Sequence, residues 1–131
     1  MTRPDARRAP PRPQRVELGF LESVRKRLPA HQRTLEALGH LYTRTGRYAD
    51  GLQVDEALIR LRPDDPVAWY NLACSQALTG QPEQALQALG NAMAMGFDDV
   101  AAIRGDQDLA SLHADPRFAA LLARHAKPTK A

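Results

Sequence analysis

The chain contains 131 residues, of which 44% are hydrophobic and 25% charged, and these values predict one globular domain rather than a disordered or membrane-embedded chain. Cys74 is the only cysteine, which excludes an intramolecular disulfide and a cysteine-rich metal site and favours a reducing compartment. No apolar run has the length of a signal-peptide core or a membrane span, so a cytoplasmic protein is the expectation.

The net charge of +3 is concentrated near the N-terminus. Residues 1–15 contain five arginines against Asp5, a charge of +4, which leaves −1 for residues 16–131. Residues 1–14 hold four prolines and no large aliphatic side chain after Met1, so they cannot bury enough surface to become ordered. We therefore predict a disordered, basic, Pro/Arg-rich tail over 1–14. Three roles stay open for it: a solvated arm, a weak salt-sensitive contact with nucleic acid or acidic lipid, and docking onto the acidic groove of a neighbouring copy.

A leading helix and a first helical hairpin are predicted next. Apolar residues recur at helical spacing from Val16 up to Pro29, which predicts a helix over 15–28. The hairpin is expected to pair helices at 32–44 and 48–61. Gly46 lies between them, where glycine adopts the left-handed backbone of a helix end without a Cβ penalty.

A second hairpin and shorter helical pieces are predicted after Pro63. Helices are expected at 66–79 and from Pro82 to near Gly96. Residues 100–103 and 108–112 read as short helical segments. A last helix is expected from Pro116, capped by Asp115 or Ala114, with residues 125–131 frayed.

The two hairpins match each other at an offset of 34 residues. The first copy has Leu35, Leu38, Gly39, Tyr42, Gly46, Gly51, Leu58 and Pro63, and the second has Trp69, Leu72, Ala73, Gln76, Gly80, Ala85, Ala92 and Phe97 at the same places. Small residues at the third and sixth of these places favour a close crossing of paired helices. A fixed period of this length is typical of a solenoid, in which each unit buries its apolar face by stacking on the next.

These residues resemble tandem tetratricopeptide repeats, most clearly in the run Trp69-Tyr70-Asn71-Leu72-Ala73 followed by Thr79-Gly80. Leu35 and Gln76 depart from the tryptophan and tyrosine usual in the family. The resemblance divides 15–124 into a half-repeat at 15–31, repeats at 32–65 and 66–99, and a cap at 100–124 similar to the helical C-terminal cap of bacterial repeats. It implies an all-α fold, a right-handed solenoid of helical hairpins with a leading helix and a helical C-terminal cap.

The resemblance also implies a concave groove that binds another polypeptide, lined by the first helix of each hairpin. The candidate partner-binding residues are Arg33, Glu36, His40, Thr43 and Arg44 in the first copy and Val67, Tyr70, Asn71, Cys74 and Ala77 in the second. The predicted function is a protein–protein interaction module, a scaffold or adaptor. The alternatives are a structural protein whose stacking ends form homo-oligomers and a nucleic-acid-associated factor that uses the basic tail.

Catalytic and metal chemistry find little support in the sequence. Some family members clamp a peptide carboxylate with lysine and asparagine, and Asn71 fits that pattern, but Glu36 would repel the incoming carboxylate. The four histidines lack the spacing of a metal site, and no phosphate-binding loop or H-E-x-x-H motif occurs. Cys74 is interpreted as a small packing residue rather than a nucleophile. We therefore expect no enzyme activity, no cofactor and no metal.

Overall fold

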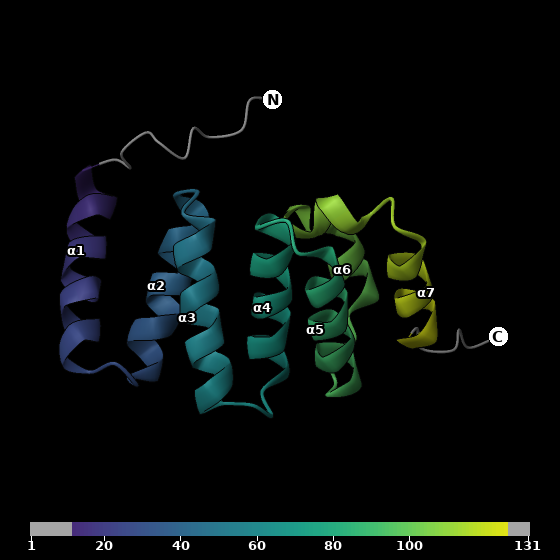
Figure 1. Ribbon diagram of the computed structural model, residues 1–131, viewed down its shortest axis with the longest axis horizontal. Coiled ribbons are helices and arrows are strands. Elements are labelled where there is room, and N and C mark those ends of the chain that lie inside the picture. Colours follow the sequence, from purple (N-terminus) through teal and green to yellow (C-terminus); the bar gives the residue numbers. More distant parts are fainter. Residues whose placement is uncertain (1–11, 126–131) are drawn as a thin grey trace. The chain divides into compact units, whose positions relative to one another are not determined.

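The computed structural model describes residues 12–125, which contain helices and no strand, so the predicted all-α class is confirmed (Figure 1). The helices form two compact units, one ending at Arg62 and the other beginning at Pro63. Contacts in a repeat protein are local, which favours such a division close to the predicted boundary between the two repeats. Residues 1–11 of the predicted tail and 126–131 of the predicted frayed end lie outside the described residues.

The first unit contains three helices, α1 (Arg12–Arg27), α2 (Gln32–Arg44) and α3 (Tyr48–Leu61), and each packs against the next in the chain (Figure 1). The two hairpin helices have the predicted bounds, whereas α1 begins three residues before the predicted 15. Residues 12–14 are therefore helical rather than part of the tail. Pro13 is compatible with this start because the first turn of a helix leaves its N–H groups without intrahelical partners.

The core of the first unit lies between these three helices. It consists of Leu18, Leu35, Leu38, Leu41, Tyr42, Val54 and Leu58. Most of its side chains follow the predicted helical spacing, but Val54 was not predicted, and Val16, Phe20, Leu28 and Leu61, which share that spacing, are exposed. Helices α2 and α3 cross closely at Gly39, where a Cβ would lie in ordinary van der Waals contact, 3.7 Å from Val54 Cγ1 and 3.4 Å from Asp55 Oδ1. Gly46 adopts a φ of 77°, as expected for the turn between the two helices.

The second unit contains α4 (Pro66–Leu78), α5 (Pro82–Ala94), α6 (Val100–Gly105), the 3₁₀ helix η1 (Gln107–Leu112) and α7 (Pro116–His125). Aspartates fix several of the helix starts. Asp65 accepts a hydrogen bond from the backbone N–H of Val67 at 2.9 Å, and Asp115 does the same for Arg117 at 2.9 Å. Asp115 is thus the residue that caps the last helix.

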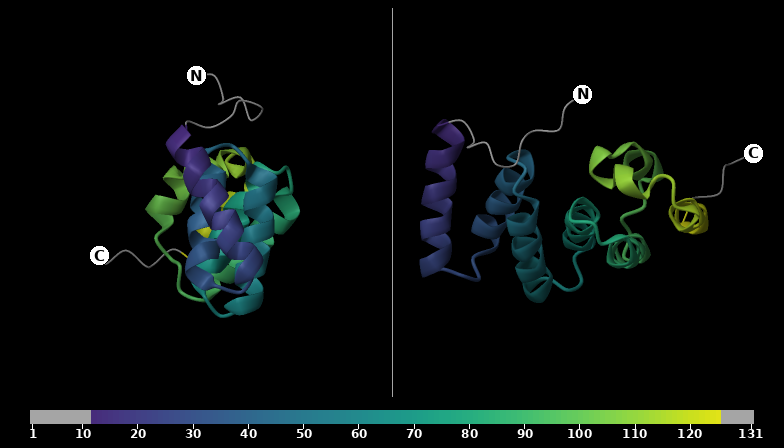
Figure 2. Two further views of the ribbon diagram at one scale, coloured as in Figure 1. Left: turned by 90° about the vertical axis from the view of Figure 1, so that its left-hand side faces the viewer. Right: turned by 45° about the horizontal axis from the view of Figure 1, so that its top comes forward.

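The C-terminal pieces complete the core of the second unit. The 3₁₀ helix η1 packs against α4 and α5, and α7 packs against α5 (Figure 2). Ile103, Leu109 and Leu112 are fully buried. Gly90 on α5 faces α7, because a Cβ there would lie in ordinary contact, 3.5 Å from Leu121 Cδ1. Within residues 12–125, no helix combines the length and apolar character required to cross a bilayer.

Candidate partner-binding site

One face of α4 carries three of the predicted binding residues, Tyr70, Cys74 and Ala77, at helical spacing. The structure covers this face with the chain's own C-terminal segment. The ring of Tyr70 stacks on Phe97, with centroids 4.1 Å apart and planes inclined by 14°. The Tyr70 hydroxyl donates a hydrogen bond to Asp106 Oδ2. These three side chains are therefore not the open part of a groove.

The contact continues along α4 toward its C-terminal end. The Cys74 thiol lies 3.9 Å from Asp106 Oδ2, and the Ser111 hydroxyl donates to the backbone carbonyl of Ala77 at 3.3 Å. Asp106 also begins η1, because its Oδ1 accepts from the backbone N–H of Asp108 at 3.0 Å. One carboxylate thus caps η1 and fastens it to α4.

Burial shifts the titration of two groups at this contact. Burial, the hydrogen bond to Asp106 and the nearby charge raise the pKa of Tyr70, so its hydroxyl remains a donor across the physiological range. Burial, with a smaller effect from Asp106, raises the pKa of Asp108. Both shifts follow from placing these groups away from water beside a carboxylate.

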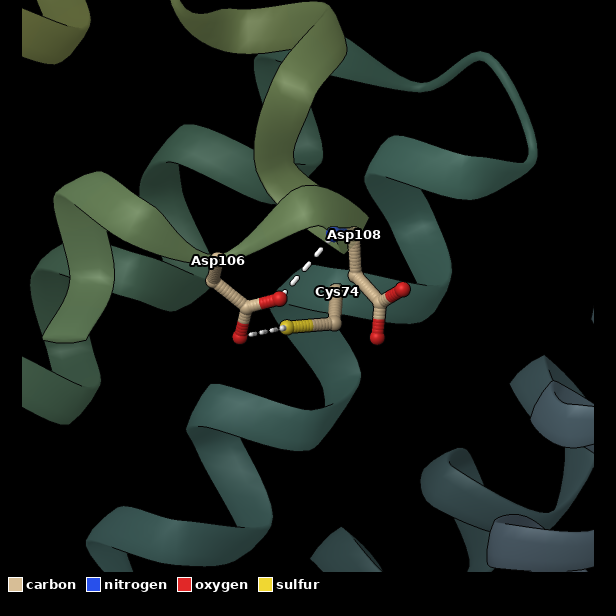
Figure 3. A group of neighbouring side chains, drawn as sticks. All are labelled: Cys74, Asp106 and Asp108. Atoms are coloured by element: carbon tan, nitrogen blue, oxygen red, sulfur yellow. Dashed lines mark hydrogen bonds between the residues drawn. The ribbon is translucent and has the colours of Figure 1, made fainter. Parts of the chain in front are cut away.

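Cys74, Asp106 and Asp108 form a cluster whose donor atoms all lie within 4.8 Å of one another (Figure 3). The sequence missed this cluster because α4 and η1 are far apart along the chain. A thiol and two carboxylates are metal-ligating groups. Both oxygens of Asp106, however, already accept hydrogen bonds from this chain. The cluster is accounted for as the fastening between η1 and α4.

Val67 and Asn71 lie on other parts of α4. The side chain of Val67 is 51% exposed, and Asn71 is half-buried. Of the five predicted residues on this helix, Val67 is therefore the most accessible.

The equivalent face of α2 is open. Arg33, Glu36, His40 and Arg44 are all exposed on it, and Thr43 is half-buried with its hydroxyl donating to the Gly39 carbonyl at 3.0 Å. Glu36 accepts a hydrogen bond from Gln32 on the same helix at 2.8 Å.

The repeat offset places Glu36, His40 and Thr43 at the positions that Tyr70, Cys74 and Ala77 occupy in the second copy. The same repeat position is thus covered in one unit and accessible in the other. Of the residues that cover it, Asp106 and Ser111 lie beyond the repeated pattern, and Phe97 stands where the first copy has Pro63. The 34-residue period therefore does not predict this contact.

Comparisons with known proteins agree with this architecture. A family model described as tetratricopeptide repeat matches residues 56–87, from α3 into α5. A chloroplastic protein from Arabidopsis thaliana is 32% identical over 87 residues, which cover 64% of this chain and 26% of that protein. The chain therefore spans about a quarter of the length of this relative. No solved structure matches this chain significantly. The helical hairpins and the family match together show a repeat protein of the tetratricopeptide type.

Proposed function

We propose that the protein is a scaffold or adaptor that binds a partner polypeptide on the exposed face of α2. Tetratricopeptide repeats generally mediate protein–protein interaction. The observation that carries the proposal is the contrast between the two copies: Arg33, Glu36 and His40 are exposed, whereas the matching face of α4 is covered by the cap.

The cap on α4 indicates how a polypeptide can occupy such a face. There, an aspartate accepts hydrogen bonds from the hydroxyl of Tyr70 and the thiol of Cys74. On α2, the side chain at the position of Cys74 is His40, one turn from Arg44. A carboxylate of the partner would receive a hydrogen bond from His40 and a charge-assisted one from Arg44. Glu36 would accept from a backbone N–H or a basic side chain of the same segment.

The test is site-specific photo-crosslinking in the source cell. A photoreactive residue at His40 should capture a defined partner, and the double variant Arg33→Ala, Arg44→Ala should lose that capture. Arg60→Ala, an exposed arginine near the end of α3, is the matched control and should retain it. Equal capture by the parent and the α2 double variant would refute binding at this face.

The same preparation separates the alternatives. A mass that rises with protein concentration would favour self-assembly, and salt-sensitive binding of DNA or RNA that is lost with residues 1–11 would favour the tail-based alternative.

A further inference from the structure

Helix α1 has a second apolar face that does not take part in the core. Leu18 is buried against the rest of the first unit, and Leu21 is partly buried beside it. Val16 and Phe20, one turn apart on another side of the helix, are 64% and 65% exposed. Together these two side chains form a small exposed apolar patch on α1, the kind of surface at which a contact outside the fold can form.

The charges around this face are four cations and one exposed carboxylate, Glu17. Arg12, Arg15, Lys26 and Arg27 are all exposed, and at 100° per residue they lie on the same half of the helix as Val16 and Phe20. Glu22 is directed to the inner side, where it accepts a hydrogen bond from the Tyr42 hydroxyl at 2.7 Å and lies 3.8 Å from Arg47.

A cleft of about 350 Å³ lies at the C-terminal end of α1, next to Lys26. Its lining residues are Glu22, Arg25, Lys26, Pro29 and Tyr42. Arg25 and Lys26 form no ion pair or side-chain hydrogen bond with any residue in 12–125, whereas Glu22 is already bonded to Tyr42. The cleft therefore contains two cations without an ion-pair partner and one carboxylate, Glu22, which lies 3.8 Å from Arg47.

We propose that α1 docks on an anionic lipid surface, lying along the headgroup region with Phe20 and Val16 inserted between lipids. The exposed cations contact headgroup phosphates, and the cleft beside Lys26 receives one of them. Aliphatic or aromatic side chains flanked by lysine and arginine are the combination that holds a helix at such an interface. This inference concerns α1 and is independent of partner binding on α2.

Other occupants of this face fit less well. In an antiparallel pair of α1 helices centred near Gly19, Arg12 of each copy would approach Arg27 of the other, and two such like-charge contacts oppose self-association. Two exposed apolar side chains also fall far short of the roughly 800 Å² per partner of a stable interface. A nucleic acid would engage the cations and leave Phe20 and Val16 in water.

The experiment is co-sedimentation of the full chain with two kinds of vesicle: pure phosphatidylcholine, and phosphatidylcholine with about one third phosphatidylglycerol. Binding is expected only to the anionic vesicles and should weaken as salt increases. Phe20→Ser should lower the bound fraction although it leaves every charge in place. Lys26→Gln with Arg27→Gln should lower the partition coefficient about fivefold for each charge removed.

Matched controls come from the second unit. Val67→Ser and Arg104→Gln replace an exposed valine and an exposed arginine and should leave vesicle binding unchanged. Circular dichroism should show the parent helix content in every variant, because the substituted side chains are exposed.

Several results would overturn the proposal. Equal binding to neutral and anionic vesicles would refute the role of anionic lipid. Full retention of vesicle binding by Phe20→Ser would refute the insertion of Phe20 and would assign the contact to the arginines of the tail alone. Complete displacement of the protein from anionic vesicles by inorganic phosphate, at a concentration equal to that of the lipid phosphate, would point to a site for free anions. A dimer that dissociates in Phe20→Ser, with no vesicle binding, would assign the face to a second copy.

Discussion

Tyr70→Phe removes the hydroxyl that joins α4 to the cap and keeps the ring that stacks on Phe97. The lost bond is made to a carboxylate, and hydrogen bonds to charged groups contribute about 1.5–3 kcal/mol. In the variant, Asp106 stays half-buried and keeps its contacts with the N–H of Asp108 and the thiol of Cys74. Water and these donors therefore compensate for part of the hydrogen bond that the Tyr70 hydroxyl no longer donates. We expect the free energy of unfolding to fall by about 1–2 kcal/mol, toward the low end of the range for charged partners.

Thermal and urea unfolding, followed by far-ultraviolet circular dichroism, measure this change. For a unit of this size, about 1 kcal/mol corresponds to a shift in Tm of roughly 4–8 °C. Tyr48→Phe is the matched control, since Tyr48 is also half-buried and its hydroxyl makes no hydrogen bond within residues 12–125. That variant should melt close to the parent.

The pH dependence gives an independent check. The pKa of Tyr70 is raised in the folded protein, so the folded state keeps this proton at a pH where the unfolded chain loses it. The stabilisation is therefore complete below the ordinary tyrosine pKa of about 10 and declines as the pH rises above it. The gap between parent and Tyr70→Phe should narrow above that pH. A Tm of Tyr70→Phe equal to that of the parent would refute the role of this hydroxyl in fastening the cap. An equal decrease in Tm for Tyr48→Phe and Tyr70→Phe would refute it as well.

Three further predictions concern other contacts. Gly39→Ala should stabilise the first unit by up to about 1 kcal/mol through helix propensity, because the added Cβ would meet Val54 at contact distance. Gly39→Leu should destabilise the same unit by about 1–3 kcal/mol through overpacking. Equal melting temperatures of the two variants would contradict the close crossing of α2 and α3. Asp108→Asn should raise the free energy of unfolding at neutral pH, because burial raises the pKa of the carboxyl it replaces and so disfavours its charged form. That gain should disappear as the pH falls below about 3.9, where Asp108 is protonated in both states, and a gain independent of pH would show that charge is not the cause. Equimolar Zn²⁺ should leave the Tm unchanged because both Asp106 oxygens are engaged, and a zinc-dependent rise would show that the cluster binds metal.

The helices of this chain were predictable to within a few residues because glycine and proline mark most of their ends. Gly46 and Gly80 have the positive φ of helix C-termini, at 77° and 75°. The exceptions have physical reasons. The composition of residues 1–14 places Pro13 in the tail, but it lies in the first turn of α1, a place with which proline is compatible. His31 caps α2 by accepting a hydrogen bond from the backbone N–H of Thr34 at 3.4 Å, a role that sequence preferences assign to serine or aspartate.

The candidate site was predictable only in part. Helical spacing places Tyr70, Cys74 and Ala77 on a common face of α4, whereas Val67 and Asn71 lie on other parts of that helix. It does not indicate which copy of that face stays open. That depends on the tertiary contacts of Tyr70 with Phe97 and Asp106, which the period does not specify.

The composition of the two faces explains why the cap covers one and not the other. Tyr70 and Cys74 present an aromatic ring, a hydroxyl and a thiol, which a short segment can bury while satisfying each polar group with a single aspartate. Covering the matching face of α2 would remove Glu36 and its neighbouring arginines from water, and burying charges without paired partners is costly. A partner that supplies opposite charges offsets that cost, whereas a cap built on Phe97 and one aspartate does not. At these equivalent positions, the residues of α4 are therefore suited to packing within the fold, and the charged residues of α2 are suited to the binding that we propose.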